Sequence, residues 1–133
     1  MIIVDSSVWV DYFNGKISRQ TDSLDRLLGQ EDIVVGDLIL TEVLQGFRDD
    51  AQFGEAKRLF DGFRIVSMVG KDLAIEAVKN YRTLRKRGST VRKTIDMMIA
   101  TYCIHNRIPL LYSDRDFDPI VAHLGLKTVP LVQ

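Results

Sequence analysis

MIIVDSS, residues 1–7, is the stretch of sequence that decides the expected fold. It contains an uninterrupted apolar run that is rich in β-branched residues, and the run stops at Asp5. Apolar runs of this kind are typical of strands that are buried on both faces of a parallel sheet. The sequence therefore predicts a central strand over residues 1–4 with a carboxylate directly after it.

The remainder of the chain alternates similar apolar runs with segments in which apolar residues recur at helical spacing. A second buried strand is expected at residues 32–35, and further strands at residues 64–68 and 110–113. A short edge strand is expected at residues 126–131, where Pro130 would be tolerated. Helices are expected at residues 8–13, 19–28, 37–47, 50–60, 72–86 and 95–105. Ser6 or Ser7 is expected to cap the first helix and Thr94 the last. This alternation indicates an α/β domain with a mainly parallel sheet.

Length and composition are those of an ordinary globular protein. The chain has 133 residues, 46% of them hydrophobic and 27% charged, which fits one domain over residues 1–133 and argues against disorder. No apolar run approaches the roughly 18 residues that are needed to span a bilayer, and no signal peptide is recognised. The single Cys103 excludes an internal disulfide and fits a reducing compartment. We therefore expect a cytoplasmic domain without membrane association.

Four acidic residues are expected to converge at one edge of the sheet. Asp5 and Asp114 each follow close on an apolar strand, and ligands of parallel α/β sheets bind beyond the carboxyl ends of the strands. Glu42 and Asp96, each on a predicted helix, could reach the same crevice. Converging carboxylates repel one another unless protons or cations neutralise them. Oxygen ligands without a His cluster suit Mg²⁺ or Mn²⁺ rather than Zn²⁺, so the predicted reaction is metal-assisted phosphodiester hydrolysis.

Each acid has a plainer interpretation when it is taken alone. An Asp at a strand end is commonly a turn former. Asp96, in the first turn of a helix, interacts favourably with the helix dipole. Glu42 alone is an ordinary solvated helical residue, and Asp37 and Asp118 are interpreted as capping or turn residues. The hypothesis of a shared site therefore depends on the four acids occurring together.

The order of these motifs resembles that of the PIN-domain nucleases. The matching segments are Ile3-Val4-Asp5-Ser6-Ser7, the helix with Glu42, Thr94-Ile95-Asp96, and Ser113-Asp114-Arg115-Asp116-Phe117. Their spacing and the total length resemble the VapC toxins of toxin–antitoxin pairs. The resemblance implies a PIN-like α/β/α sandwich with a mainly parallel central sheet of four to five strands. It also implies a Mg²⁺- or Mn²⁺-dependent endoribonuclease.

The resemblance assigns roles to particular residues. Asp5, Glu42, Asp96 and Asp114 match the family's catalytic acids, and Asp5, Asp96 and Asp114 would hold one or two metal ions. Glu42 would bind metal directly or through water, and Asp116 is a possible further metal ligand. Ser6 matches a supporting hydroxyl that could hydrogen-bond a carboxylate or a metal-bound water. The family often has Thr where this chain has Tyr112, so no hydroxyl role is carried over to that position; Ser113 is the alternative.

Basic residues are concentrated just before Asp96. The chain balances 18 Lys and Arg against 18 Asp and Glu, yet residues 79–93 contain seven basic residues and no acid. Such a run is often only a solvated helix face. Here Arg85, Arg87 and Arg92 are candidates to bind an RNA backbone beside the acidic crevice.

The family resemblance also implies partners. A VapB-like antitoxin would lay a helix in a hydrophobic groove and place a basic side chain in the acidic pocket. A homodimer is expected on the same ground.

The function predicted from the sequence is therefore a cytoplasmic endoribonuclease toxin that cleaves tRNA or another structured RNA. The alternative is a catalytically weak PIN-type module that binds RNA or another protein. A nuclease that acts on DNA is a further alternative. A phosphoacceptor receiver domain is disfavoured, because it would have paired acids after the first strand and a Lys after a late strand, whereas here Ser6 follows Asp5 and no Lys follows Asp114.

Overall fold

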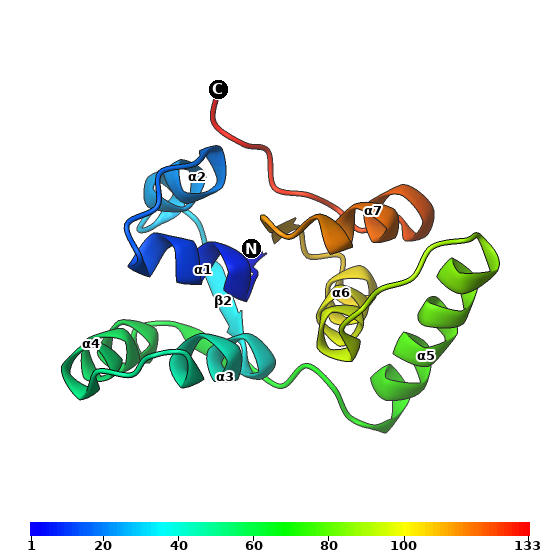
Figure 1. Cartoon of the computed structure of the whole chain (residues 1–133), viewed down its shortest axis with the longest axis horizontal. Helices are drawn as coiled ribbons and strands as arrows, with labels where there is room; N and C mark the ends of the chain where they lie inside the picture. Colours follow the sequence, from blue (N-terminus) through cyan, green and yellow to red (C-terminus); the bar gives the residue numbers. More distant parts are fainter.

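A computed structural model describes residues 1–133 of the chain. The strands are β1 (Ile2–Val4), β2 (Ile33–Gly36), β3 (Arg64–Val66) and β4 (Leu110–Leu111). The α-helices are α1 (Ser6–Phe13), α2 (Arg19–Leu27), α3 (Asp37–Gln45), α4 (Asp50–Asp61), α5 (Lys71–Lys86), α6 (Thr94–Asn106) and α7 (Asp118–Leu124), with a 3₁₀ helix η1 at Arg115–Phe117. Strands and helices thus alternate as the sequence predicts (Figure 1).

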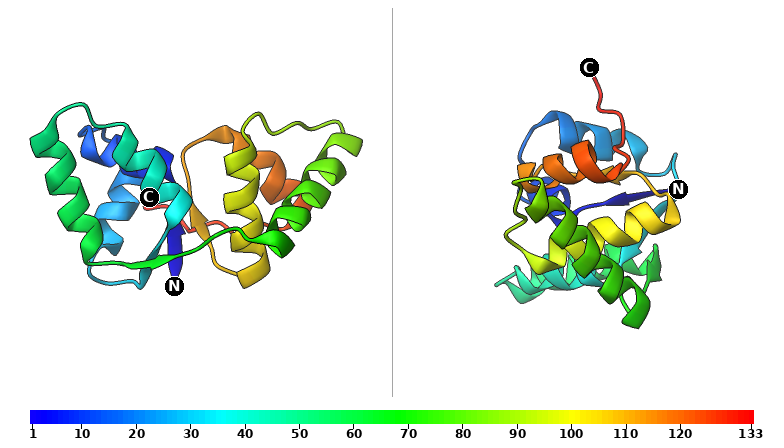
Figure 2. Two further views of the ribbon diagram at one scale, coloured as in Figure 1. Left: turned by 90° about the horizontal axis from the view of Figure 1, so that it is seen from below. Right: turned by 90° about the vertical axis from the view of Figure 1, so that its right-hand side faces the viewer.

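The strands form one four-stranded parallel sheet in the order β3-β2-β1-β4. The opening strand is central, because Ile3 pairs with Val34 of β2 on one side and with Leu110 of β4 on the other. β1, β2 and β4 are buried throughout, as expected for apolar strands covered on both faces. Helices lie on both sides of β1 in the right-hand view of Figure 2, which confirms the predicted α/β/α sandwich with a sheet of four strands.

The strand order places a topological switch point between β1 and β4. The chain steps outward from β1 to β2 and then to β3, and returns through α5 and α6 to add β4 on the opposite side of β1. The helices that follow β1 and β4 therefore diverge, which leaves a crevice at the carboxyl ends of these two strands. Asp5 and Asp114 both lie at that end of the sheet.

One hydrophobic core of 26 buried residues fixes this arrangement. Trp9 of α1 is fully buried and packs edge to face against Phe60 of α4 and Phe63, with Phe13 stacked on its indole ring. These contacts tie α1 to α4, and α5 packs along α6 on the other side of the molecule (Figure 1). No helix is both long and apolar enough to cross a membrane.

Three local predictions were wrong. The expected edge strand at residues 126–131 is reduced to a single parallel bridge between Thr128 and Leu110. The first helix is capped by Asp5 rather than by Ser6 or Ser7, because the Asp5 carboxylate accepts a hydrogen bond from the Ser7 amide. Lys93 rather than Thr94 occupies the N-cap position of α6.

Two short elements near the C-terminus were not predicted at all. The 3₁₀ helix η1 and helix α7 follow Asp114 directly. They are too short to show helical periodicity, and Pro119, which looks like a helix breaker in the sequence, is accommodated at the start of α7.

Gly36 is expected to be essential for the packing of β2. A Cβ atom at this position would overlap the Met68 side chain, which is itself fully buried. We predict that Gly36→Ala lowers the free energy of unfolding by about 1–3 kcal/mol, the usual range for overpacking a core. Urea denaturation checks this. The matched control is Gly54→Ala in α4, where the added Cβ would lie at an ordinary contact distance, 3.6 Å, from the Arg58 side chain. This substitution should stabilise the helix, by up to about 1 kcal/mol. Equal stability of both variants would contradict the prediction.

Candidate active site

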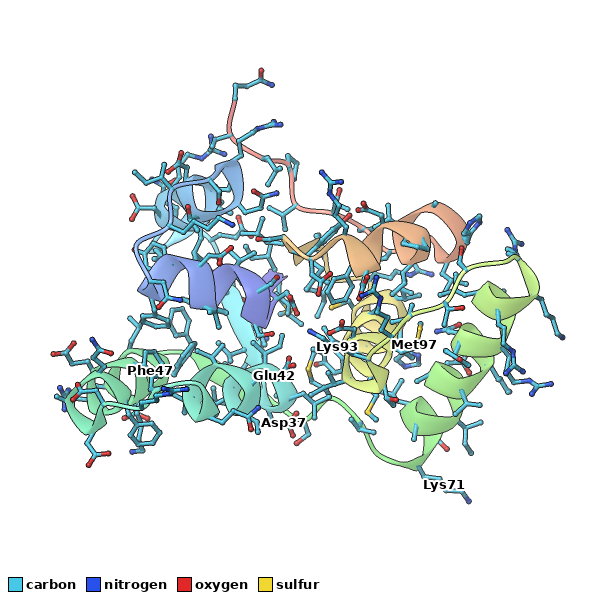
Figure 3. All side chains as sticks on the ribbon, in the orientation of Figure 1. Asp37, Glu42, Phe47, Lys71, Lys93 and Met97 are labelled. Carbon is cyan, nitrogen blue, oxygen red and sulfur yellow. The ribbon has the colours of Figure 1, made fainter.

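A polar cavity opens at the carboxyl ends of β1 and β4. It is lined almost entirely by polar residues contributed by α1, α3, the start of α6 and the segment after β4: Asp5, Ser6, Ser7, Val10, Asp11, Glu42, Gln45, Lys93, Asp96, Ser113 and Asp114. Figure 3 shows Glu42 on α3 and Lys93 before α6 near the centre of the molecule, where these elements meet. All four acids that the sequence predicts are therefore brought together in one cavity.

Asp5 is held in place by the turn that links β1 to α1. Its Oδ2 atom accepts hydrogen bonds from the amide and the hydroxyl of Ser7, as is usual for an N-cap residue. The Ser7 hydroxyl also accepts a hydrogen bond from the Ser113 amide at 3.2 Å, which joins the ends of β1 and β4. The Asp5 side chain is only 2% exposed, and its Oδ1 atom has no hydrogen-bond partner. One oxygen is thus fixed and the other is free for a ligand.

Asp96 lies close to Asp5, in the first turn of α6. The residues after it in this helix include buried members of the core, so the helix is anchored and its first turn is held at the cavity. Asp96 is 3% exposed, and its Oδ2 atom has no hydrogen-bond partner. A buried carboxylate oxygen without a partner costs free energy unless a proton or a cation neutralises it.

Glu42 and Asp114 complete the acidic cluster. Glu42 is half-buried, and its Oε1 atom accepts a hydrogen bond from the Ser6 hydroxyl at 2.9 Å. Asp114 caps η1 by accepting a hydrogen bond from the Asp116 amide through Oδ1. Its Oδ2 atom lies 3.8 Å from the Lys93 ammonium. The cluster therefore has one cation at its rim.

The carboxylates form two groups that could each hold a metal ion. Oxygen atoms of Asp5, Glu42 and Asp96 lie within 4.8 Å of one another, and so do oxygen atoms of Asp96, Asp114 and Asp116. Asp96 belongs to both groups. The structure contains four buried side-chain polar atoms that lack a hydrogen-bond partner, and three of them, on Asp5, Asp96 and Ser113, belong to residues of this cavity. Unpaired hard oxygen atoms in a confined space fit a divalent cation.

Burial and mutual repulsion shift the pKa values of the two innermost acids. Burial raises the pKa of Asp5, and the charge of Glu42 adds to this, although the hydrogen bonds from Ser7 oppose it. Burial also raises the pKa of Asp96 to about 7, and the charges of Asp5, Asp114 and Glu42 contribute, while Lys93 acts in the opposite direction. Without a cation, Asp96 therefore exchanges its proton near neutral pH.

The basic run before Asp96 is only partly at the cavity. Lys93 lines it, whereas Arg85, Arg87 and Arg92 do not. The Arg85 guanidinium lies over the ring of Tyr81 at 5.7 Å, and Arg92 lines a separate hollow between α5 and α6. The three arginines are exposed, so contact with RNA at this surface stays a prediction.

Sequence reasoning missed Lys93 and Ser7 as site residues. Lys93 was available as the member of the basic run that lies closest to Asp96 in the sequence. Ser7 carried no such signal, because its link to Ser113 spans the whole length of the chain between β1 and β4. Ser113 itself lines the cavity, whereas the Tyr112 hydroxyl donates to Asp118, away from the acids.

Comparison with known proteins shows the family to which the chain belongs. The family model described as "PIN domain" matches residues 2–121. This chain belongs to the PIN-domain family. Ribonuclease VapC11 of Mycobacterium tuberculosis is 34% identical to this PIN domain over 132 residues, which is 96% of either chain.

Solved structures of low sequence identity share the fold. VapBC2 from Rickettsia felis, in a crystal structure with a DNA fragment from its promoter, has 17% identity and a TM-score of 0.75 over 99% of this chain and 100% of the other. FitAcB from Neisseria gonorrhoeae has 14% identity and a TM-score of 0.73 over 98% and 97%.

Ionised Asp96 is expected to destabilise the metal-free fold. Its pKa is about 7 in the folded chain and near 3.8 in the unfolded chain, so the folded state loses stability as the pH rises between these values. The loss is absent below about pH 4 and complete above about pH 7, where it amounts to about 4 kcal/mol. We predict that Asp96→Asn raises the melting temperature in EDTA at pH 8, on the order of 10 °C, and far less at pH 4.

Scanning calorimetry at both pH values measures this difference. Asp72→Asn, in the first turn of α5 and outside the cavity, is the matched control and should show no such pH-dependent gain. A gain for Asp96→Asn that is the same at both pH values would show that repulsion and burial of this charge do not control stability.

Proposed function

We propose that this PIN domain is the toxin endoribonuclease of a VapBC-type toxin–antitoxin pair, and that it hydrolyses RNA phosphodiesters with a divalent cation. The observation that carries the proposal is that the acids form two clusters of three carboxylates each, and that Asp96 belongs to both clusters. The similarity to Ribonuclease VapC11 over nearly the whole chain supports RNA as the substrate class. Structured RNA, such as tRNA, is the substrate that we expect.

The residues of the cavity divide into metal ligands and residues that orient them. Asp5, Asp96 and Asp114 would hold one or two ions, Glu42 would bind directly or through water, and Asp116 would complete the second group. Mg²⁺ or Mn²⁺ suits these oxygen ligands, and when bound it would polarise the phosphodiester and lower the pKa of water. Catalysis is thus assigned to Asp5, Glu42, Asp96 and Asp114.

The hydroxyl groups and the lysine have supporting roles in this proposal. Ser7 fixes Oδ2 of Asp5 and leaves Oδ1 free for a ligand, and Ser6 orients Glu42. Lys93 lies at the rim beside Asp114, where its ammonium can bind a non-bridging phosphate oxygen of the substrate. These groups hold the reacting atoms in position, and water attack on phosphorus leaves a 5′-phosphate and a 3′-hydroxyl.

An antitoxin of the VapB type is the proposed protein partner. A groove between α1, α3 and the start of α4 is lined by Val10, Phe13, Val43, Phe47 and neighbouring polar residues. Val10 also lines the acidic cavity, so the two hollows are adjacent, and Phe47 is marked in Figure 3. An amphipathic helix in this groove could extend a basic side chain to the carboxylates. The structures of VapBC2 and FitAcB support a partner of this kind.

Other parts of the proposal have different grounds. The homodimer rests on the family alone. The single domain over residues 1–133 and the cytoplasmic location rest on length, composition and the single cysteine, and RNA contact by Arg85, Arg87 and Arg92 rests on the basic run before Asp96. The homodimer is tested by light scattering of the purified chain.

Cleavage of total cellular RNA tests the nuclease. The purified chain is expected to produce discrete fragments with Mg²⁺ or Mn²⁺ and none with EDTA. Asp96→Asn should lower the rate by at least about a hundredfold, because it removes the ligand common to both carboxylate groups. Asp72→Asn, which keeps the cavity intact, should cleave like the parent chain. Fragments with 2′,3′-cyclic phosphate ends would exclude water as the nucleophile.

The antitoxin groove is tested by a substitution outside the acidic cluster. A tagged chain purified from its native host should retain a small partner that inhibits cleavage. Phe47→Asp should release the partner, because it places a charge among the apolar side chains of the groove. Ile17→Asp, at a side chain that is 86% exposed and outside the groove, should retain it. Retention by both variants would contradict the proposed binding mode.

A further inference from the structure

A second cavity adjoins the acidic one on the far side of Ser113. It lies between the start of α2, the end of β4, η1 and the C-terminal segment. In Figure 1 the C-terminal segment, in red, passes near α2. Its wall includes Arg19, Gln20, Tyr112, Ser113, Arg115 and Thr128. Ser113 lines both cavities, so a ligand that leaves the acidic cluster over Ser113 enters the second cavity directly.

Two arginines give the second cavity its positive charge. Arg115 of η1 is exposed, and its side chain makes no hydrogen bond or ion pair within the chain. Arg19 of α2 is also exposed, and only its Nε atom is engaged, in a hydrogen bond to the Val132 carbonyl at 3.0 Å. The terminal nitrogen atoms of both guanidinium groups are therefore available for a ligand, in a geometry that suits phosphate oxygens.

Asp118 is the one acid in this wall, and one of its two carboxylate oxygen atoms is engaged in a hydrogen bond. Its Oδ1 atom accepts a hydrogen bond from the Tyr112 hydroxyl at 2.9 Å. This bond holds the Tyr112 side chain in the wall of the cavity. An aromatic ring beside arginines is the combination by which proteins bind single-stranded RNA, with stacking for a base and positive charge for the backbone.

The acidic cavity is negatively charged, so RNA that enters it needs a positively charged surface close by. Five carboxylates and one lysine line the acidic cavity, so an RNA strand is repelled there except where cations neutralise the cluster. Only the phosphodiester that reacts lies close enough to those cations to be attracted by them. The phosphates that flank it need a separate source of positive charge within one or two nucleotides.

We propose that the cavity around Arg19 and Arg115 binds the RNA strand that flanks the scissile phosphodiester, with the two arginines on its phosphates and Tyr112 beside a base. This inference rests on the proposed ribonuclease function and names the route of the substrate across the protein. The strand runs from the acidic cluster over Ser113 and along the end of β4 into the second cavity. It does not require the surface of Arg85, Arg87 and Arg92.

RNA binding in the absence of cleavage tests this route. Affinity for a short labelled single-stranded RNA is measured by fluorescence anisotropy with Mg²⁺ over a range of salt concentrations, in the Asp96→Asn background. Adding Arg19→Ala and Arg115→Ala should weaken binding by at least about tenfold and lower the salt slope by about 1.4, which is the loss of two phosphate contacts. Arg115→Ala alone should give about half of the slope change, and it breaks no contact within the fold.

Arg26→Ala with Arg58→Ala is the control that removes the same charge elsewhere. Arg26 lies on the same helix as Arg19, Arg58 lies on α4, and neither lines the cavity. If this pair weakened RNA binding equally, the effect would depend on net charge alone and the inference would be overturned. Unchanged binding in the Arg19 and Arg115 variants, with loss only when Arg85, Arg87 and Arg92 are replaced, would also overturn it.

Three further outcomes separate this inference from the proposals on which it rests. If the parent chain cleaves RNA while Arg19→Ala/Arg115→Ala binds RNA normally, the nuclease stands and the flanking route is wrong. If the variant binds RNA normally but loses its antitoxin, the cavity belongs to the protein partner. If the parent chain neither binds nor cleaves RNA, the ribonuclease proposal fails and the inference fails with it.

Discussion

Repulsion between carboxylates that are buried close together is the constraint on which the rest of this structure depends. Asp5 and Asp96 lie almost wholly inside the protein, and each has an oxygen atom without a partner. The free energy of placing them there must come from elsewhere in the fold, chiefly from the apolar core behind them. β1 and α6 supply it, since both are anchored by buried residues directly next to these acids.

The parallel sheet brings these unfavourably buried carboxylates together in one cavity. Because β1 and β4 are neighbours with the same direction, the residues that follow them meet at one edge. The Ser7 hydroxyl then links the two ends by bonding the Asp5 carboxylate and the Ser113 amide. The cluster is held by backbone turns and short hydroxyl side chains, which leave little freedom for the carboxylates to move apart. A cation would meet ligands that are already in place.

The sequence predicted the parts of the molecule that depend on local patterns. Apolar β-branched runs identified β1 and β2, and the position of Asp5 and Asp114 near strand ends placed both at the carboxyl edge of the sheet. Glu42 and Asp96 were candidates because their predicted helices could bring them to the same crevice. Only the family resemblance strengthened this interpretation, because a single acid on a helix has no distinguishing local pattern. The short η1 and α7 were missed since neither is long enough to show periodicity. The link through Ser7 and the shared wall at Ser113 arise from residues far apart in the chain, which local patterns do not reveal.

The separation of Asp5 from Asp114 along the chain also governs when activity can appear. β4 is the last strand to leave the ribosome, yet it must pair with β1, the first. Until that pairing forms, the acidic cluster lacks one side and the cavity has no wall at Ser113. A growing chain therefore has no complete acidic cluster before β4 has been synthesised, and the ribosome that makes it does not meet the assembled cluster until then. Contacts between such distant segments also form slowly, which extends this interval beyond the emergence of β4 from the ribosome.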